Sequence, residues 1–158
     1  MNFESSKCLA EHVASLGGRL YLVGGAVRDK LRGAQVFDED YVITGLAPER
    51  VAFEKIIGSD FPVFLVEIAG KKCEVALART EKKNGTGYHG FTFYCGSDVD
   101  IMQDLARRDL TINAMAEDVL TGELFDPFNR YSNERTQNFV PLPLWKSSLR
   151  YEHADFGL

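Results

Sequence analysis

Apolar side chains at the start of the chain recur at the spacing of a helix. Leu9, Val13 and Leu16 fall on one face of such a helix, and Gly17 would end it. The pattern predicts a short amphipathic helix that packs against the rest of the fold. We expect it to belong to an N-terminal helical extension of residues 1–19.

Later apolar runs follow the strand pattern and the helix pattern in turn. Strands are predicted at residues 20–23, 37–44, 61–68 and 72–79. Helices are predicted at residues 26–31, 48–57 and 100–117. The last two strands would form a hairpin, and the polar, glycine-rich residues 81–90 predict a mobile loop. Strands in a hairpin, mixed with helices, favour an α+β fold over a doubly wound parallel sheet, with a small mixed or antiparallel sheet flanked by helices.

Composition and charge limit the size of the core, the cellular location and the mode of nucleic-acid binding that we expect. The chain has 158 residues, 45% hydrophobic and 26% charged, which suits one ordinary core. We find no signal peptide and no apolar run of membrane-spanning length, so we expect a cytoplasmic protein that contacts no membrane. The formal net charge of −5 argues against a broad basic surface for nucleic acid. Any RNA binding therefore needs a local patch or further domains.

Two carboxylates stand two residues apart in the predicted strand 37–44. Asp38 and Asp40 would point to the same face, because side chains alternate along a strand. On a shared face they can hold divalent metal ions. An isolated Asp-x-Asp is more often a solvated turn, so the metal interpretation depends on the neighbouring motifs.

Groups that bind phosphate precede this carboxylate pair. Gly24 and Gly25 allow a ligand to approach the backbone closely, and the helix that follows offers free N–H groups. Arg28 can add a guanidinium fork to a phosphate, although an ion pair with Asp29 is the plainer alternative. The segment contains neither G-x-G-x-x-G nor G-K-[ST], which excludes the Rossmann and P-loop motifs.

A second cationic cluster lies in the predicted helix 100–117. It contains Arg107, Arg108, Asp109 and Asn113. These residues suit a second phosphate or ribose contact, and a charged helix surface is the alternative. Paired carboxylates with two sets of phosphate donors supply what two-metal attack of a hydroxyl on an α-phosphate requires.

Five ordered blocks of sequence carry a resemblance to a known family. They are YLVGGAVRDKLRG, FDEDYVITG, DFPVFL, ALARTEKKNGTGYHGFTF and DLARRDLTINAMA. The chain resembles, over residues 20–129, the head domain of proteobacterial-type CCA-adding tRNA nucleotidyltransferases, which belong with the poly(A) polymerases. The resemblance implies a polymerase-beta-like nucleotidyltransferase head.

The resemblance also implies roles for particular residues. Asp38 and Asp40 would hold Mg²⁺, and Gly25, Arg28 and Arg108 would contact the incoming CTP or ATP. The implied reaction transfers CMP and then AMP to the tRNA 3′ end, with pyrophosphate leaving. One metal ion would lower the pKa of the 3′ hydroxyl, and the other would steady the triphosphate.

Two further positions are weaker candidates. Glu74, on the strand that leads into ALART, could be a third carboxylate near the metals, or a plain surface residue if it points outward. Arg79 and the loop beyond it resemble the family's flexible loop, associated with the switch from C to A addition. An ordinary solvated loop is the alternative.

The resemblance ends at Asn129. Family members continue with a neck helix bearing an E-D-x-x-R motif, followed by body and tail domains. Residues 130–158 show no clear periodicity, so we expect an atypical tail without these domains, from a truncation or a frameshift. Three alternatives stay open: a catalytically silent nucleotide-binding fragment, a poly(A) polymerase-like enzyme, and a minimal nucleotidyltransferase with another substrate.

Overall fold

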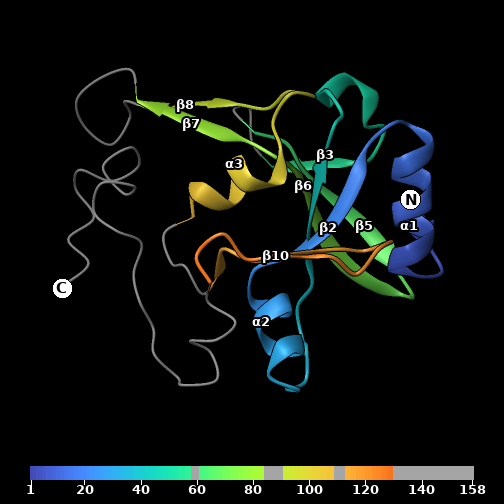
Figure 1. The fold of residues 1–158 in the computed structure, drawn as a ribbon. Helices are drawn as coiled ribbons and strands as arrows, with labels where there is room; N and C mark the ends of the chain where they lie inside the picture. Colours follow the sequence, from blue (N-terminus) through green and yellow to red (C-terminus); the bar gives the residue numbers. More distant parts are fainter. Residues whose placement is uncertain (58–60, 84–90, 109–112, 130–158) are drawn as a thin grey trace.

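A mixed β-sheet forms the centre of the molecule in the computed structural model, which describes residues 1–57, 61–83, 91–108 and 113–129. Its strands, in spatial order, are β1 (Asn2–Phe3), β5 (Val63–Ile68), β6 (Lys71–Leu77), β3 (Asp40–Thr44), β2 (Arg19–Val23), β9 (Ala116–Asp118) and β10 (Leu124–Phe125). A short strand, β4 (Lys55–Ile57), pairs with β5 off this path. Two further strands, β7 (Thr80–Lys83) and β8 (Phe91–Tyr94), form a separate ribbon (Figure 1).

The pairing directions confirm the predicted α+β class. β3 pairs with β6 in parallel, and β2 pairs with β3 and β9 antiparallel. β5 and β6 form the predicted antiparallel hairpin. The helices are α1 (Ser6–Ser15), α2 (Gly25–Leu31), α3 (Ile101–Ala106) and the 3₁₀ turn η1 (Pro48–Arg50).

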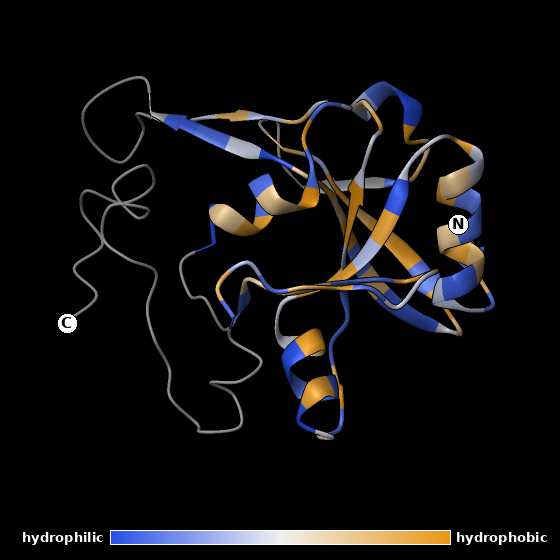
Figure 2. Ribbon diagram, in the orientation of Figure 1, coloured by the Kyte–Doolittle hydropathy of each residue, from blue (hydrophilic) through white to orange (hydrophobic). Residues whose placement is uncertain are grey.

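Each face of the sheet is covered by a different helix, and α1 and α3 lie on opposite sides of the central strands (Figure 1). α1 packs Leu9 and Val13 into the core of one face, with Ile43 of β3. On the other face, Leu105 of α3 packs against Val42. Figure 2 shows hydrophobic residues concentrated in the central strands and on parts of the helices.

Local chemistry fixes the ends of the helices. The Ser5 hydroxyl accepts a hydrogen bond from the Cys8 N–H at 3.2 Å and caps the start of α1, and Gly17, at φ +95°, follows its end. A capping box of Asp100 and Gln103 begins α3. The predicted helix at the N-terminus is thereby confirmed, and it is packed into the sheet core. No helix among the described residues has the length and apolar character needed to cross a bilayer.

The helix predicted over residues 48–57 is wrong. Only η1 is helical, and the chain then extends into β4. Val51 and Phe53 are buried while Glu54 is exposed, which is the alternation of an extended chain. Phe53 stacks edge-on against Phe64 of β5, with ring centroids 5.9 Å apart. This non-local aromatic contact outweighs the local helical pattern.

Three other predicted elements have different bounds. The strand predicted over 37–44 begins only at Asp40. Part of the predicted loop 81–90 belongs to β7, and residues 84–90 lie outside the described residues. The predicted helix 100–117 ends at Ala106, and Ala116 begins a strand instead. Its neighbours Ala114 and Met115 are also fully buried, and an unbroken buried run suits a central strand better than an amphipathic helix.

Candidate active site

Two carboxylates from neighbouring parallel strands lie side by side on the face covered by α3. Asp40 on β3 is the register partner of Glu74 on β6, and of Val23 on β2. In-register residues of paired strands point to the same face. Asp40 and Glu74 accordingly line one pocket of about 190 Å³, together with Phe61. Three arginines complete its polar lining: Arg79, Arg107 and Arg108.

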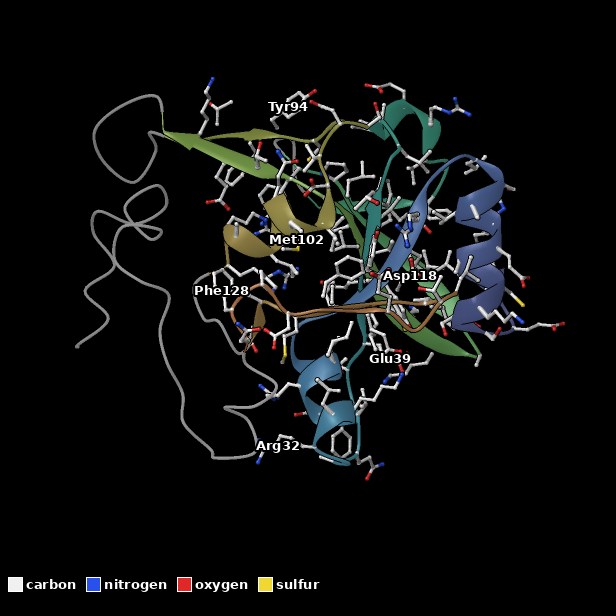
Figure 3. The ribbon with its side chains drawn as sticks, viewed as in Figure 1. Arg32, Glu39, Tyr94, Met102, Asp118 and Phe128 are labelled. Carbon is white, nitrogen blue, oxygen red and sulfur yellow. The ribbon has the colours of Figure 1, made fainter. Side chains whose placement is uncertain are left out.

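The backbone before β3 separates the acidic residues onto two sides. Glu39 accepts a hydrogen bond of 2.9 Å from the hydroxyl of Tyr41, which is buried on the α1 side (Glu39 is labelled in Figure 3). Asp40, one residue on, lines the pocket on the opposite face. Lys71, at the start of β6, donates to the carbonyl of Phe37 and fixes the segment that carries Asp38.

Neighbouring groups perturb the carboxyl of Asp40. Burial raises its pKa above the usual aspartate value, the Arg108 guanidinium lowers it in part, and the negative charge of Asp38 raises it again. Asp38 therefore acts on Asp40 electrostatically, although it lies outside the residues that line the pocket. A carboxylate that is difficult to ionise alone is one that a bound cation would stabilise.

The two glycines keep room in front of two guanidinium groups. Gly24 has φ +70°, a conformation that favours glycine, and its N–H donates to the Met115 carbonyl at 3.1 Å. A β-carbon at Gly24 would lie 3.6 Å from Nη1 of Arg108, and one at Gly25 would lie 3.3 Å from Nη2 of Arg28. The glycine turn thus lies directly against the cationic side chains.

Arg28 joins α2 to the segment that precedes β9. Its Nε donates to Asp29 at 2.7 Å, and its Nη1 donates to the side-chain oxygen of Asn113 at 3.5 Å. The hydrogen bond from Arg28 lowers the pKa of the Asp29 carboxyl. The ion pair between Arg28 and Asp29, the plainer of the two predicted alternatives, is therefore present. The same guanidinium still lies against Gly25 and Asn113.

Arg79, which lines the pocket, packs beside two aromatic rings that also contact each other. Its guanidinium carbon lies 3.6 Å from the ring centroid of Phe61 and 5.2 Å from that of Phe93. Burial lowers the pKa of Arg79, and the charge of Arg107 lowers it further. Nε of Arg79 and Nε of Arg108 are buried without a hydrogen-bond partner within the described part of the chain. Two such donors beside one pocket suit an anionic ligand.

One buried acid at this site escaped the sequence analysis. Asp104 is fully buried, and its carboxylate accepts hydrogen bonds from Arg107 and Arg108. Its position gave the only available signal, because it lies three residues after Ile101 and directly before Leu105 on the apolar stripe of α3. A charged residue on a buried stripe indicates a paired, functional or structural role.

The structure brings together most of the predicted site residues. Around the pocket and the glycine turn it gathers Gly24, Gly25, Arg28, Asp40, Glu74, Arg79, Arg107, Arg108 and Asn113. Asp109 lies outside the described residues. Within the described ranges, no three or more histidine, cysteine, aspartate or glutamate side chains are grouped so that they could hold a metal ion. A metal ion here would need oxygen ligands from water or substrate as well.

A mixed sheet with a carboxylate pair on its central strands, facing a cluster of arginines, defines an α+β head domain of the nucleotidyltransferase class. Residues 20–137 match the family model described as the Poly A polymerase head domain. The chain belongs to this family, and the resemblance found in its sequence is confirmed.

Curated relatives and solved structures agree with the family assignment. A CCA-adding enzyme from Marinobacter nauticus is 56% identical over 115 residues, covering 72% of this chain and 30% of the relative. A multifunctional CCA protein from Burkholderia mallei is 49% identical over 128 residues, covering 77% of this chain and 30% of the relative. The structure of the Bacillus stearothermophilus CCA-adding enzyme in complex with CTP has a TM-score of 0.65 at 31% identity, covering 84% of this chain and 31% of that one. The chain thus spans about 30% of the length of the curated relatives it matches.

Proposed function

We propose that this chain carries the catalytic head of a CCA-adding tRNA nucleotidyltransferase. The head would bind CTP or ATP and transfer CMP and AMP to the 3′ end of tRNA in the cytoplasm. The observation that carries the proposal is the pocket in which Asp40 and Glu74 face three arginines. The names of the relatives support the reaction, and the neighbouring structures include a complex with CTP and one with a primer tRNA and an ATP analogue.

The donor set of the pocket fits Mg²⁺. Asp40 and Glu74 offer hard carboxylate oxygens from adjacent strands, and Asp38 lies close enough to raise the pKa of Asp40. Mg²⁺ is usually held by one or two carboxylates, with water and substrate phosphates completing its coordination. We assign Asp38 and Asp40 as its ligands, and Glu74 as a neighbouring carboxylate of the same site. When bound, the ion would lower the pKa of the attacking 3′ hydroxyl and offset negative charge on the triphosphate.

The arginines would bind and orient the triphosphate. Arg108 lies between Asp40, whose pKa it lowers, and the glycine turn at Gly24. Arg28 lies against the same turn at Gly25. Guanidinium forks fixed on both sides of a glycine turn suit the oxygens of a polyphosphate, because charge-assisted hydrogen bonds from arginine are short and directional. These contacts would align the α-phosphate with the carboxylates.

The tRNA would be held weakly by this chain alone. The net charge is −5, and Arg79, Arg107 and Arg108 face a pocket rather than an open surface. Nucleic-acid affinity depends mostly on phosphate neutralisation by exposed cations. We therefore assign to this chain the chemistry of nucleotide transfer, and assign most of the tRNA affinity to parts that the relatives carry in their remaining length.

Poly(A) polymerase activity is the second candidate, favoured by the name of the matching family model. The two activities differ in their products.

Labelled CTP and ATP would be supplied with Mg²⁺ and a tRNA lacking its CCA end, using the full chain and its Asp38→Ala, Asp40→Ala double variant. We expect ordered addition of C, C and A, lost in the double variant. Adenylate tails without cytidine would favour poly(A) synthesis. No incorporation by the folded chain would contradict independent activity and favour a silent nucleotide-binding fragment.

A further inference from the structure

Asp104 is an acidic residue of α3 for which the proposed reaction has no direct use. It is fully buried between Ile101 and Leu105, both of which pack into the core between α3 and the sheet. An ionised carboxylate in a protein interior is strongly unfavourable unless it is paired and hydrogen-bonded. Asp104 can therefore be accommodated in the core only with partners that pair with its carboxylate.

Its partners are three residues that line the pocket. Oδ1 of Asp104 accepts a hydrogen bond from the backbone N–H of Arg79 and one from Nε of Arg107, each at 3.1 Å. Oδ2 accepts from Nη2 of Arg108 at 3.2 Å. Arg79, Arg107 and Arg108 all line the pocket shared by Asp40 and Glu74, whereas Asp104 does not. One buried carboxylate thus connects the segment after β6 to the C-terminal end of α3.

We propose that Asp104 is a positioning residue that fixes the guanidinium groups of Arg107 and Arg108 for the triphosphate. The inference rests on the proposed function and extends it to a residue that touches neither nucleotide nor metal. A free arginine side chain samples many rotamers, and a single fixed carboxylate removes most of that freedom before the ligand arrives. Arg107 also lies 3.7 Å from a carboxylate oxygen of Glu81, so a second acidic side chain helps to hold its guanidinium.

The orientation of the Arg108 guanidinium shows which groups Asp104 would align. With Nη2 bound to Asp104, its Nη1 lies close to Gly24, 3.6 Å from the place of a β-carbon there. The same guanidinium lowers the pKa of Asp40. Arg108 therefore lies between the carboxylate side and the glycine side of the site. Without Asp104 the charge would remain, but its direction would not be fixed.

A matched pair of variants separates positioning from folding. Asp104→Asn removes the charge and keeps the shape. Asp118→Asn makes the same change at the second buried carboxylate of the described residues, which accepts a 2.7 Å hydrogen bond from Arg19 and does not line the pocket. Binding of CTP in the presence of Mg²⁺ would be measured on the full chain by titration calorimetry, with thermal unfolding in parallel. We expect about a tenfold or greater rise in the Kd of Asp104→Asn, and no change in that of Asp118→Asn.

A double-mutant cycle tests whether Asp104 acts through Arg108. In an Arg108→Ala background, Asp104→Asn should raise the Kd for CTP much less than it does in the unaltered chain. Fully additive effects would overturn the inference. If Asp104→Asn fails to fold, Arg108→Lys keeps the charge but loses the fork that Asp104 holds, and CTP binding as tight as that of the unaltered chain would overturn it.

The outcomes distinguish this inference from the proposed function. CTP binding by the unaltered chain that is equal in the folded Asp104→Asn variant would overturn the positioning role alone. Failure of the unaltered, folded chain to bind CTP at all would overturn the nucleotide site, and the positioning role with it.

Discussion

At the residue scale, the ionisation of Asp40 would govern metal binding at the proposed site. Burial raises its pKa, Arg108 lowers it in part and Asp38 raises it, so this carboxyl holds its proton to a higher pH than an ordinary aspartate does. A carboxylate must lose its proton to coordinate a metal ion. The chemistry of the site is consequently linked to pH through one side chain.

Divalent-ion affinity should therefore decrease on acidification at a higher pH than for a site built on an unperturbed aspartate. Protonation of Asp40 competes with the ion, and its raised pKa shifts that competition upward. Mn²⁺ titrations followed by electron paramagnetic resonance between about pH 4 and pH 7 would show this decrease. Asp40→Asn should bind Mn²⁺ more weakly and lack this pH dependence. Identical pH profiles for the two proteins would contradict the assignment.

Asp118 should contribute to stability, because its pKa is shifted in the opposite direction to that of Asp40. Burial by itself raises its pKa, but the Thr121 N–H, the Arg19 guanidinium and the Leu120 N–H together hold it below the usual value. The folded state then binds the proton less readily than the unfolded state. The stabilisation is present above the ordinary aspartate pKa and is lost as the pH falls through the lower, folded-state pKa.

Asp118→Asn should thus lower the free energy of unfolding by about 1–3 kcal/mol at neutral pH. The difference from the unaltered chain should shrink in strong acid. Urea unfolding at a series of pH values would measure it, with Glu11→Gln as a control because Glu11 forms only an exposed ion pair with Lys7 at 3.9 Å. A difference that stays constant at all pH values would argue against an ionic role for Asp118.

Some of the candidate site residues could be predicted from the sequence. Asp40, Arg28 and Arg108 lie in recognisable motifs, and Glu74 could be named as a candidate because its strand was predicted. Whether Glu74 faces Asp40 depends on the register between β3 and β6, which no local pattern specifies. Asp104 was missed because an acidic residue in a helix is normally assigned to the solvent, and only its tertiary partners explain its burial.

Elements with strong periodicity were predictable and short ones were not. α1, β2 and the β5–β6 hairpin have the patterns of their classes. β4 and β9 are three residues long, and their strand conformation depends on pairing with β5 and β2. The local pattern of both segments predicted helix. Non-local pairing of this kind overrides local propensity, so the prediction was wrong there.

α1 should be required for the stability of the head. Leu9 is fully buried in the core between α1 and the sheet, so Leu9→Ala should lower the free energy of unfolding by about 2–5 kcal/mol. Lys7→Ala, on the exposed side of the same helix, should have little effect. Chemical denaturation followed by circular dichroism would measure both. Equal stability of Leu9→Ala and the unaltered chain would show that α1 is not part of the folded core.

At the scale of the whole molecule, the proposed nucleotide site belongs to an acidic chain. Its net charge is −5 and it spans about 30% of the length of its curated relatives. The chain should bind tRNA weakly and lose that binding steeply as salt concentration rises. Filter binding at two salt concentrations would measure this. Tight, salt-resistant tRNA binding would contradict the division of roles proposed for the head and the remaining length of its relatives.

The most direct test of the account is the dependence of CTP binding on a divalent ion. The full chain and Asp40→Asn would each be titrated with CTP, first with Mg²⁺ and then after its removal with EDTA. The account predicts that the full chain binds CTP, that EDTA weakens this binding, and that Asp40→Asn binds weakly under both conditions. CTP binding that is indifferent to both Mg²⁺ and Asp40 would contradict the assignment of this pocket as a metal-dependent nucleotide site.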